Sequence, residues 1–407
     1  MLKKIVKPQF YRKVLKNGMT ILFEKRDLPI VSVAFAVRAG GINETETEKG
    51  ISHFIEHMLF KGTPKRNAKQ IAEEIEKNGG VLNGFTDEQI TAYWCKIQSK
   101  HLNVALEVLS DMIKNPKFDK TELEKERKVI FEEIKMIKDT PQLYIYHEIQ
   151  KSLYENPFGM PLIGTYKTMS SISQKQLTEK FRNSYASNNI VLCVIGNANF
   201  EDLVNFSEKN FGNEKGKIPQ FKINLKNEEK IEKRKGIDQA NMVFAHHVPL
   251  ASDKKHYAAQ ALSVIIAGGM SSRLFSEIRE KRNLAYAVKG DSVTNKDYSY
   301  NLIYVGTSKD NIVKVKKLII EEFKKVAKDL GEKELNQVKE QLIGNYHLSM
   351  EDSHDQMINL LGYEMDGNIN EFYNYEQNIS NVKLSDIKEL AKNASEKYSF
   401  FALIPED

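Results

Sequence analysis

The chain has 407 residues, of which 41% are hydrophobic and 28% are charged, with 60 Lys and Arg against 55 Asp and Glu. This length is sufficient for two domains of about 200 residues each. The composition is that of a globular protein and excludes a disordered or fibrous one. The net charge of +5 is nearly balanced, and no basic block stands clear of interleaved Glu. We therefore expect no nucleic-acid partner.

The sequence contains no run of about 18 apolar residues that could cross a membrane. The N-terminal stretch MLKKIVKPQFYRKVLKNG has neither a continuous apolar segment nor a small-residue cleavage site. These features predict a cytoplasmic protein with no membrane partner. Cys95 and Cys193 each lie inside an apolar, strand-like run, so both are expected to be buried core thiols.

The first half of the chain mixes strand and helix patterns. Residues 19–39 alternate apolar and polar positions around a DLP turn, which predicts two strands of a half-buried sheet. Further strands are expected at residues 90–98 and 190–195. Residues 101–138 have the pattern of a long helical stretch, broken near Asn115-Pro116.

The second half repeats this order at an offset of roughly 210 residues. The segment ISQKQLTEKFRNSYASNNIVLCVIGN parallels VKLSDIKELAKNASEKYSFFALIPED at the C-terminus, and KTELEKERKVIFEEIK parallels EKELNQVKEQLIGNYH. The charge-rich run between the two halves of the chain is expected to be a solvated linker. We predict two homologous α+β domains at residues 1–215 and 237–407, joined by a linker at 216–236. Each domain should be a mainly antiparallel sheet with helices packed on one face.

The segment GISHFIEHMLFKGT, residues 50–63, places His53, Glu56 and His57 within one helical turn. Imidazoles at positions i and i+4 share a helix face, so both can reach one metal ion while the carboxylate at i+3 lies beside them. This arrangement suits zinc hydrolysis, in which the carboxylate takes a proton from water. The alternative is that the two histidines are surface or hydrogen-bonded core side chains.

Catalytic zinc usually has three protein ligands, so an acidic residue must come from elsewhere. Glu126 and Glu133 lie two turns apart on one face of the predicted helix TELEKERKVIFEEIKMIKD. Taken alone, they could also be solvated helix charges, because the segment is rich in both signs.

With these residues in view, the sequence resembles the inverted-zinc-motif metallopeptidases, the pitrilysin or M16 family, which includes the mitochondrial processing peptidase and insulin-degrading enzyme. HFIEH matches the family motif H-x-x-E-H, and ERKVIFEEI follows at the family's spacing. The resemblance implies one Zn²⁺ per chain, held by His53, His57 and Glu133. It also implies that Glu126 does not bind the metal itself but orients the residues that do.

Two other segments carry the resemblance. Residues 79–94, GGVLNGFTDEQITAYW, are similar to the family's GG-x-x-N-A-x-T strand, which implies an edge strand that holds substrate. The residues concerned are Asn83, Gly84, Phe85 and Thr86, with Gly84 standing where Ala is usual.

The segment GGMSSRLFSEIREKRNLAYAV is similar to the family's distal signature, an Arg followed seven residues later by Tyr. The resemblance implies that Arg279 and Tyr286 bind substrate and stabilise the oxyanion of the tetrahedral intermediate, as a cation and a phenol can do. From the residues alone, Arg279 would be a surface helix charge and Tyr286 a half-buried strand residue.

The resemblance implies a zinc-dependent endopeptidase that cleaves unfolded peptides inside a closed chamber, with Glu56 as general base on a zinc-bound water. A two-domain chain would form half of the clamshell chamber, so we expect a homodimer, or a heterodimer with a metal-less homologue. One alternative is a non-proteolytic scaffold subunit, although such subunits typically lose some of the site residues. Another is a catalytic subunit that is active only with a separate partner chain. High Lys content favours a bacterial source.

Overall fold

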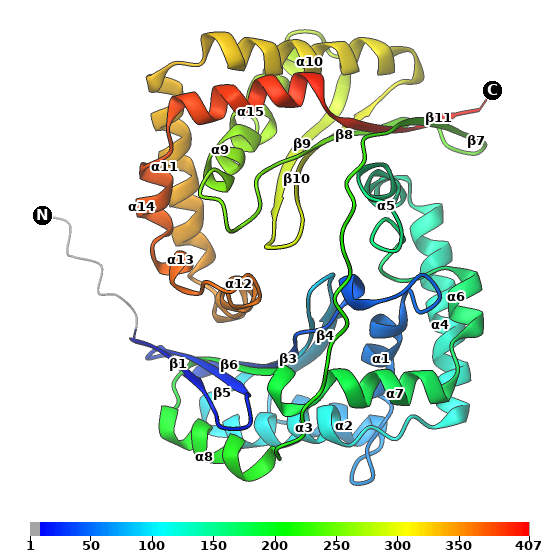
Figure 1. Ribbon diagram of the computed structural model, residues 1–407, viewed down its shortest axis with the longest axis vertical. Helices are drawn as coiled ribbons and strands as arrows, with labels where there is room; N and C mark the ends of the chain where they lie inside the picture. The colour runs from blue at the N-terminus through cyan, green and yellow to red at the C-terminus, as the bar shows by residue number, and fades with distance from the viewer. Residues whose placement is uncertain (1–8, 407) are drawn as a thin grey trace, which may run out of the picture. The chain divides into compact units, whose positions relative to one another are not determined.

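The computed structural model describes residues 9–406, which form two compact units, each built on one β-sheet (Figure 1). The first unit contains the described residues up to 134, together with 161–221 and 349–365. The second unit contains residues 135–160, 222–348 and the described residues from 366 onward. The first eight residues, where the predicted N-terminal domain begins, lie outside the described part of the chain.

The sheet of the first unit has six strands in the order β1-β2-β6-β3-β5-β4. All neighbouring pairs are antiparallel except β2 and β6. The strands are β1 (Gln9–Val14), β2 (Thr20–Lys25), β3 (Ile30–Val37), β4 (Val81–Thr86), β5 (Thr91–Gln98) and β6 (Ile190–Gly196). β6, which reads IVLCVIG, is buried along its whole length, as expected for a central strand that is covered on both faces.

Helices cover both faces of this sheet. On one face, α3 packs on β3 and β5, α1 on β4 and β5, and α8 on β2. On the other face lies α12, where the hydroxyls of Ser353 and Ser32 on β3 are 2.9 Å apart. The helices of this unit are α1 (Ile51–Leu59), α2 (Ala68–Glu76), α3 (Leu102–Lys114), α4 (Lys120–Asp139), α6 (Tyr166–Ser171), α7 (Gln174–Ser184), α8 (Phe200–Asn210) and α12 (Ser353–Met365).

The sheet of the second unit repeats the topology of the first. Its order is β7-β11-β8-β10-β9, with β7 and β11 parallel and the other pairs antiparallel. The strands are β7 (Glu229–Arg234), β8 (Ala240–His247), β9 (Ala285–Thr294), β10 (Ser299–Thr307) and β11 (Ser399–Pro405). They correspond in order to β2, β3, β4, β5 and β6, which confirms the two homologous domains expected from the sequence repeat.

Most helices of the second unit gather on one face of its sheet, where Phe244 on β8 stacks on Phe323 of α10 (Figure 1). A single helix, α5, packs on β8 and β11 from the opposite face, and the ring of its Tyr144 lies edge-on to Phe401. The helices are α5 (Pro141–Leu153), α9 (His256–Ala267), α10 (Ile312–Asp329), α11 (Glu332–Ser349), α13 (Asn370–Tyr373), α14 (Tyr375–Ser380) and α15 (Leu384–Glu396).

The two units exchange one helix each. α5 follows α4 in the first half of the sequence but belongs to the second unit, and α12 follows α11 in the second half but belongs to the first. The compact units therefore differ from the contiguous domains 1–215 and 237–407 by these two segments. Each exchanged helix covers the face of the sheet that lies opposite the other helices of its unit.

The segment between the halves is more ordered than the predicted linker at 216–236. Residues 229–234 form β7, which pairs in parallel with β11. Before it, Gly216 is held from both sides by Asn188, whose side chain accepts from the Gly216 N–H at 2.7 Å and donates to its carbonyl at 3.0 Å. The prediction of a solvated linker is therefore wrong for β7 and for the chain around Gly216.

The expectation that helices pack on only one face of each sheet is corrected, because α12 covers the second face of the first sheet and α5 that of the second. The remaining expectations for the fold hold. The α+β class, the mainly antiparallel sheets and the strands at 19–39, 90–98 and 190–195 are confirmed, as is the helix break between α3 and α4. Cys95 and Cys193 are both free and buried. Among the described residues, no helix is long and apolar enough to cross a membrane.

Candidate metal centre

A glycine and a buried carboxylate hold the N-terminus of the helix that carries the H-x-x-E-H motif. α1 starts after Gly50, whose φ of +96° lies in the left-handed region that glycine adopts without strain. The buried carboxylate of Glu44 accepts the backbone N–H groups of Gly50 at 2.9 Å and Ser52 at 2.7 Å. A negative charge at the first turn satisfies N–H groups that have no partner within the helix. The start of α1 at Ile51, two residues before His53, is thereby fixed.

Three ligand groups converge from α1 and α4. Nε2 of His57 lies 3.3 Å from Nε2 of His53. Oε2 of Glu133, on α4, lies 3.6 Å from the His57 nitrogen and 3.8 Å from that of His53. The three side chains are partly buried. The sequence predicted that these residues share one site, and the structure brings them within reach of one ion.

The spacing of these atoms suits tetrahedral zinc. With Zn–N and Zn–O bonds of about 2.0–2.2 Å, two ligand atoms of a tetrahedral site lie about 3.3–3.6 Å apart. The observed separations of 3.3, 3.6 and 3.8 Å are close to this, so Zn²⁺ requires only small side-chain adjustments. Two imidazoles and one carboxylate are also the donor set of many catalytic zinc sites, which leave one coordination position open.

Glu126 supports the site from behind His57. Its Oε2 lies 3.1 Å from Nδ1 of His57, and its Oε1 lies 2.7 Å from Nζ of Lys61. Because a carboxylate only accepts, Nδ1 of His57 carries the proton, and Nε2 is left with a lone pair for a metal. Lys61 holds the second oxygen of Glu126, so the carboxylate cannot rotate away.

Burial keeps one imidazole of the site neutral. Burial, together with the neighbouring His57, lowers the pKa of His53 to about 3. Burial also disfavours a charge on His57, but the hydrogen bond to Glu126 and the charges of Glu133 and Glu56 outweigh it and raise its pKa. Burial raises the pKa of Glu133, against the opposing effect of His57. A bound dication would favour the neutral imidazoles and the ionised carboxylate, since metals bind those forms.

Glu56 lies between the two histidines in sequence and turns its carboxylate toward the edge of the sheet. The hydroxyl of Thr86, the last residue of β4, donates to Oε2 of Glu56 at 2.6 Å. Burial raises the pKa of Glu56, although the hydrogen bond from Thr86 opposes this shift. A raised pKa makes a carboxylate a stronger proton acceptor, which suits a general base.

Comparison with known proteins decides the family. A model of the insulinase-type peptidases of family M16 matches residues 20–166, and a model of the M16 inactive domain matches residues 171–342. A protein of Bacillus subtilis is 33% identical over 351 residues, with 85% of this chain and 86% of the relative covered. A protein of Rickettsia felis is 34% identical over 350 residues, with 85% of each covered. Both relatives carry the name uncharacterized zinc protease.

The chain belongs to the M16 peptidase family. Its zinc-type ligand group lies in the part that matches the insulinase model, and its second unit supplies most of the part that matches the inactive domain. Solved structures share the whole fold. A protease from Helicobacter pylori has a TM-score of 0.91 at 23% identity, covering 98% of this chain and 100% of that one. An M16 inactive-domain protein from Pseudomonas fluorescens has a TM-score of 0.88 at 19% identity, covering 99% of each.

The strand expected to hold substrate in M16 peptidases is only partly at an edge. β4 (Val81–Thr86) is the edge strand, whereas residues 91–94 lie in β5, which is paired on both sides. The expectation of one edge strand within residues 79–94 is therefore corrected. Asn83 is exposed, and its side chain accepts the N–H of Gly84 at 2.8 Å. Gly84 and Phe85 are partly buried.

Arg279 and Tyr286, the distal pair of the M16 signature, belong to the second unit and line one pocket together. Arg279 lies on a short π-helix, Phe275–Glu280, with its guanidinium 4.9 Å from the centre of the Phe275 ring. π-Helical turns are rare and often mark functional sites. Tyr286 lies on the edge strand β9 with 46% of its surface exposed. Both side chains are thus accessible.

Several residues around the site were not predicted from the sequence. Lys61 follows the motif by four positions and could have been expected to face Glu126, because it continues the face of His57. The bond between Thr86 and Glu56 could not have been expected, since it joins residues that only the folded sheet brings together. Tyr304 and Asn241, which are linked to Tyr286 through hydrogen bonds, have the sequence pattern of ordinary buried strand residues.

Proposed function

We propose that this chain is a zinc-dependent endopeptidase that hydrolyses unfolded peptides. The observation that carries the proposal is the group of His53, His57 and Glu133 at tetrahedral spacing, with Glu56 on the same turn of α1. The zinc protease names of bacterial relatives support the same chemistry. When bound there, zinc would act as a Lewis acid that polarises the peptide carbonyl and lowers the pKa of water.

The substrate is proposed to bind as an added strand on β4. The free edge of β4 offers main-chain N–H and C=O groups, which bind an extended peptide with little demand on its side chains. Thr86, at the end of β4, is hydrogen-bonded to Glu56. A peptide aligned on this edge would therefore run toward the general base.

Glu56 is the proposed proton carrier. It takes a proton from the attacking water and later delivers it to the leaving amine, and its raised pKa suits both steps. Arg279 and Tyr286 are proposed to stabilise the oxyanion through a positive charge and a phenol proton. Their shared, exposed pocket supports a role in binding substrate.

We further propose that the chain works as a homodimer whose enclosed chamber admits unfolded peptides. One chain carries both the metal ligands and the Arg279/Tyr286 pair, so two identical copies could complete each other's sites. Mixed dimers of Glu56→Gln and Tyr286→Phe chains should regain part of the activity after subunit exchange. A stably folded domain should survive incubation that degrades an unfolded peptide, and rapid cutting at its core bonds would contradict an enclosed site.

The deciding experiment is cleavage of a mixed pool of unstructured peptides, followed by mass spectrometry. Wild type should cut internal bonds, and Glu56→Gln should lose activity by at least about 100-fold while keeping its zinc. Glu132→Gln, at an exposed neighbour of Glu133 on α4, is the matched control and should remain active. If zinc-loaded wild type does not cut, a scaffold role or a separate partner subunit becomes the better explanation.

A further inference from the structure

The strand that carries Tyr286 is irregular at that residue. β9 and β10 pair in register from Ser299 opposite Thr294 to Gly306 opposite Ala287, and then Thr307 pairs with Ala285. Tyr286 is therefore the extra residue of a β-bulge and has no partner across the ladder. A bulge changes the direction in which a side chain points, and bulges are frequent beside active sites.

The bulge directs the Tyr286 ring over a glycine. A Cβ atom built on Gly306 of β10 would lie 2.2 Å from Cζ of Tyr286 and 2.4 Å from its hydroxyl oxygen. No side chain tolerates such a distance, so the ring can occupy this place only because residue 306 is glycine. The backbone of Gly306 is not in the left-handed region, so its conformation does not require a glycine. The close approach of the Tyr286 ring does require one.

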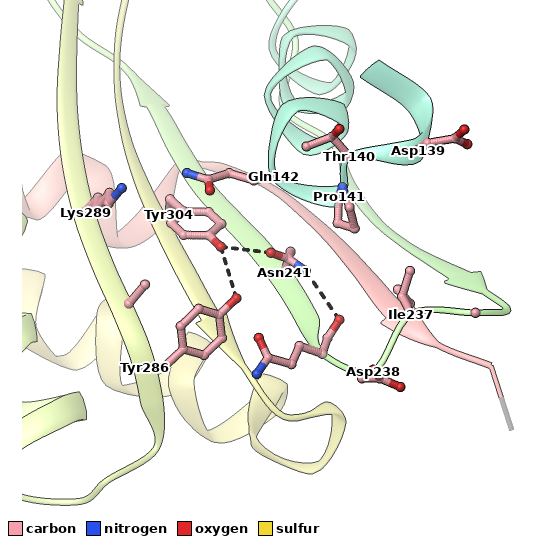
Figure 2. Close-up of a pocket in the computed structure, with 13 residues that line it drawn as sticks. Asp139, Thr140, Pro141, Gln142, Ile237, Asp238, Asn241, Tyr286, Lys289 and Tyr304 are labelled. Atoms are coloured by element: carbon pink, nitrogen blue, oxygen red, sulfur yellow. Dashed lines mark hydrogen bonds between the residues drawn. The ribbon is translucent and has the colours of Figure 1, made fainter. Parts of the chain in front are cut away.

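A chain of hydrogen bonds fixes the end of the ring (Figure 2). The hydroxyl of the buried Tyr304 donates to Oδ1 of Asn241 at 2.8 Å, and the amide of Asn241 donates to the carbonyl of Gln239 at 3.3 Å. This second bond sets the orientation of the amide, with its oxygen toward Tyr304. The only hydroxyl proton of Tyr304 is used in its bond to Asn241. In the 3.3 Å contact between the two tyrosine hydroxyls, Tyr286 is therefore the donor and Tyr304 the acceptor.

The proton of Tyr286 therefore has a defined direction. Burial and the neighbouring Tyr286 raise the pKa of Tyr304, which keeps it protonated and unable to take over that proton. The contact of 3.3 Å is long for a bond between two hydroxyls, so it can be exchanged for a stronger acceptor at little cost. Tyr286 is 46% exposed and lines a pocket together with Arg279.

We propose that Gly306, Tyr304 and Asn241 form a seat that positions the phenol of Tyr286 for peptide hydrolysis. Tyr304 and Gly306 are positioning residues, because they act on substrate only through Tyr286. This inference rests on the proposed function for its catalytic meaning, but the seat itself is a property of the second unit and can be tested separately.

The test compares kinetics and crystal structures of four variants with wild type. Tyr286→Phe removes the phenol, Tyr304→Phe removes its acceptor, the double variant removes both, and Gly306→Ala displaces the ring. Tyr146→Phe is the control, since its ring lies 6.1 Å from that of Tyr304 while its hydroxyl is hydrogen-bonded to Gln142 of its own helix. Folding is checked by melting temperature in each case.

The expected pattern is specific to positioning. Tyr304→Phe should lower kcat by about three- to tenfold, as loss of one hydrogen bond predicts, with KM little changed. In the Tyr286→Phe background it should have no further effect. Gly306→Ala should match Tyr286→Phe in kcat, and its crystals should show the Tyr286 ring in a different rotamer. The control should behave as wild type.

Two results would overturn the seat. One is an equal kcat loss from Tyr304→Phe with and without the Tyr286 hydroxyl, which would mean that Tyr304 acts elsewhere. The other is an unmoved Tyr286 ring in crystals of Gly306→Ala or, if that variant does not fold, of Tyr304→Phe. If wild type shows no cleavage that depends on Glu56, the proposed function has failed, and the ring positions alone decide on the seat.

Discussion

The hydroxyl of Thr86 donates a 2.6 Å hydrogen bond to Oε2 of Glu56. This bond joins the end of the edge strand β4 to the metal-site helix α1. It holds the carboxylate in one rotamer, in surroundings whose burial raises the pKa of Glu56. The position of the proposed general base therefore depends on the strand that is proposed to bind substrate.

Replacing Thr86 tests this dependence. Thr86→Val keeps the shape of the side chain but removes the donor, so kcat should fall by about tenfold, as expected for a lost hydrogen bond to a charged group. Thr86→Ser restores the donor and should recover most of the activity. The control is Thr178→Val, because the Thr178 hydroxyl donates to the carbonyl of Gln174 in its own helix. Equal activities of the Val and Ser variants at position 86 would show that the hydroxyl is unimportant.

The metal site makes a prediction about zinc content. Purified protein should hold one zinc per chain by elemental analysis, and His53→Ala or Glu133→Ala should lose it because each removes a ligand. Glu126→Gln should keep the site but bind zinc about 10- to 100-fold more weakly, since it loosens His57. Competition with a chelator measures this affinity independently of activity.

A second zinc per chain would contradict the assignment of one site. The other group of potential ligands among the described residues is Asp352, His354 and Asp355. It contains one imidazole, and its Asp352 forms a 2.6 Å ion pair with Lys96. The side chains of both aspartates are largely exposed to water, which competes with a metal. Unchanged zinc content in His53→Ala would direct attention to this group.

The sequence was sufficient for those features that depend on local patterns. The period of apolar residues located β2, β3, β5 and β6, and the spacing of His53 and His57 indicated that their side chains could meet. Glu133 was assigned to the same site through the resemblance to M16 peptidases. The repeat at an offset of roughly 210 residues correctly indicated two similar folds, because equivalent strands such as β6 and β11 keep the same buried pattern.

Features that depend on tertiary packing could not be predicted in this way. The apolar faces of α5 and α12 show that each helix is covered, but not which sheet covers it. β7, which reads EKIEKR, looks like a charged linker because it is an edge strand with mostly exposed side chains and is held by its main chain. The hydrogen bond between the Tyr304 hydroxyl and Asn241 joins two strands, β10 and β8, that become neighbours only in the folded sheet.

Acid should destabilise the second unit through His246. Burial lowers the pKa of His246 to about 4, below the value of about 6.5 that it has when unfolded. As the pH falls from 6.5 toward 4, the unfolded chain binds a proton that the folded chain does not, so stability is lost in that window. At pH 5 the loss is about 2 kcal/mol.

Calorimetry of wild type and His246→Gln checks this prediction. The melting temperature of wild type should fall between pH 7 and pH 5, and the fall should be smaller by several degrees in the variant, which cannot be protonated. His247, the neighbouring histidine, stays in both proteins and contributes equally. Parallel curves for the two proteins across this range would contradict a neutral, buried His246.

The last prediction concerns the buried charges that fix the start of α1. Lys49 has no exposed surface, and its ammonium group donates to the carbonyl of Gly41 at 2.9 Å. It lies 3.6 Å from Glu88 and 3.9 Å from Glu44, the carboxylate that accepts the first N–H groups of α1. Lys49→Met should leave Glu44 as a buried charge without its cation, which costs about 3–5 kcal/mol of the free energy of unfolding.

Urea unfolding followed by tryptophan fluorescence measures this loss, because the single tryptophan, Trp94, lies on β5 of the same unit. Lys69→Met is the matched control, since the Lys69 side chain is 81% exposed and its ion pair with Glu73 should contribute less than about 1 kcal/mol. Zinc affinity should also fall in Lys49→Met, because the turn of α1 that carries His53 begins at the N–H groups that Glu44 holds. A loss of stability no larger than that of the control would mean that the carboxylates at the start of α1 are stable without their buried cation.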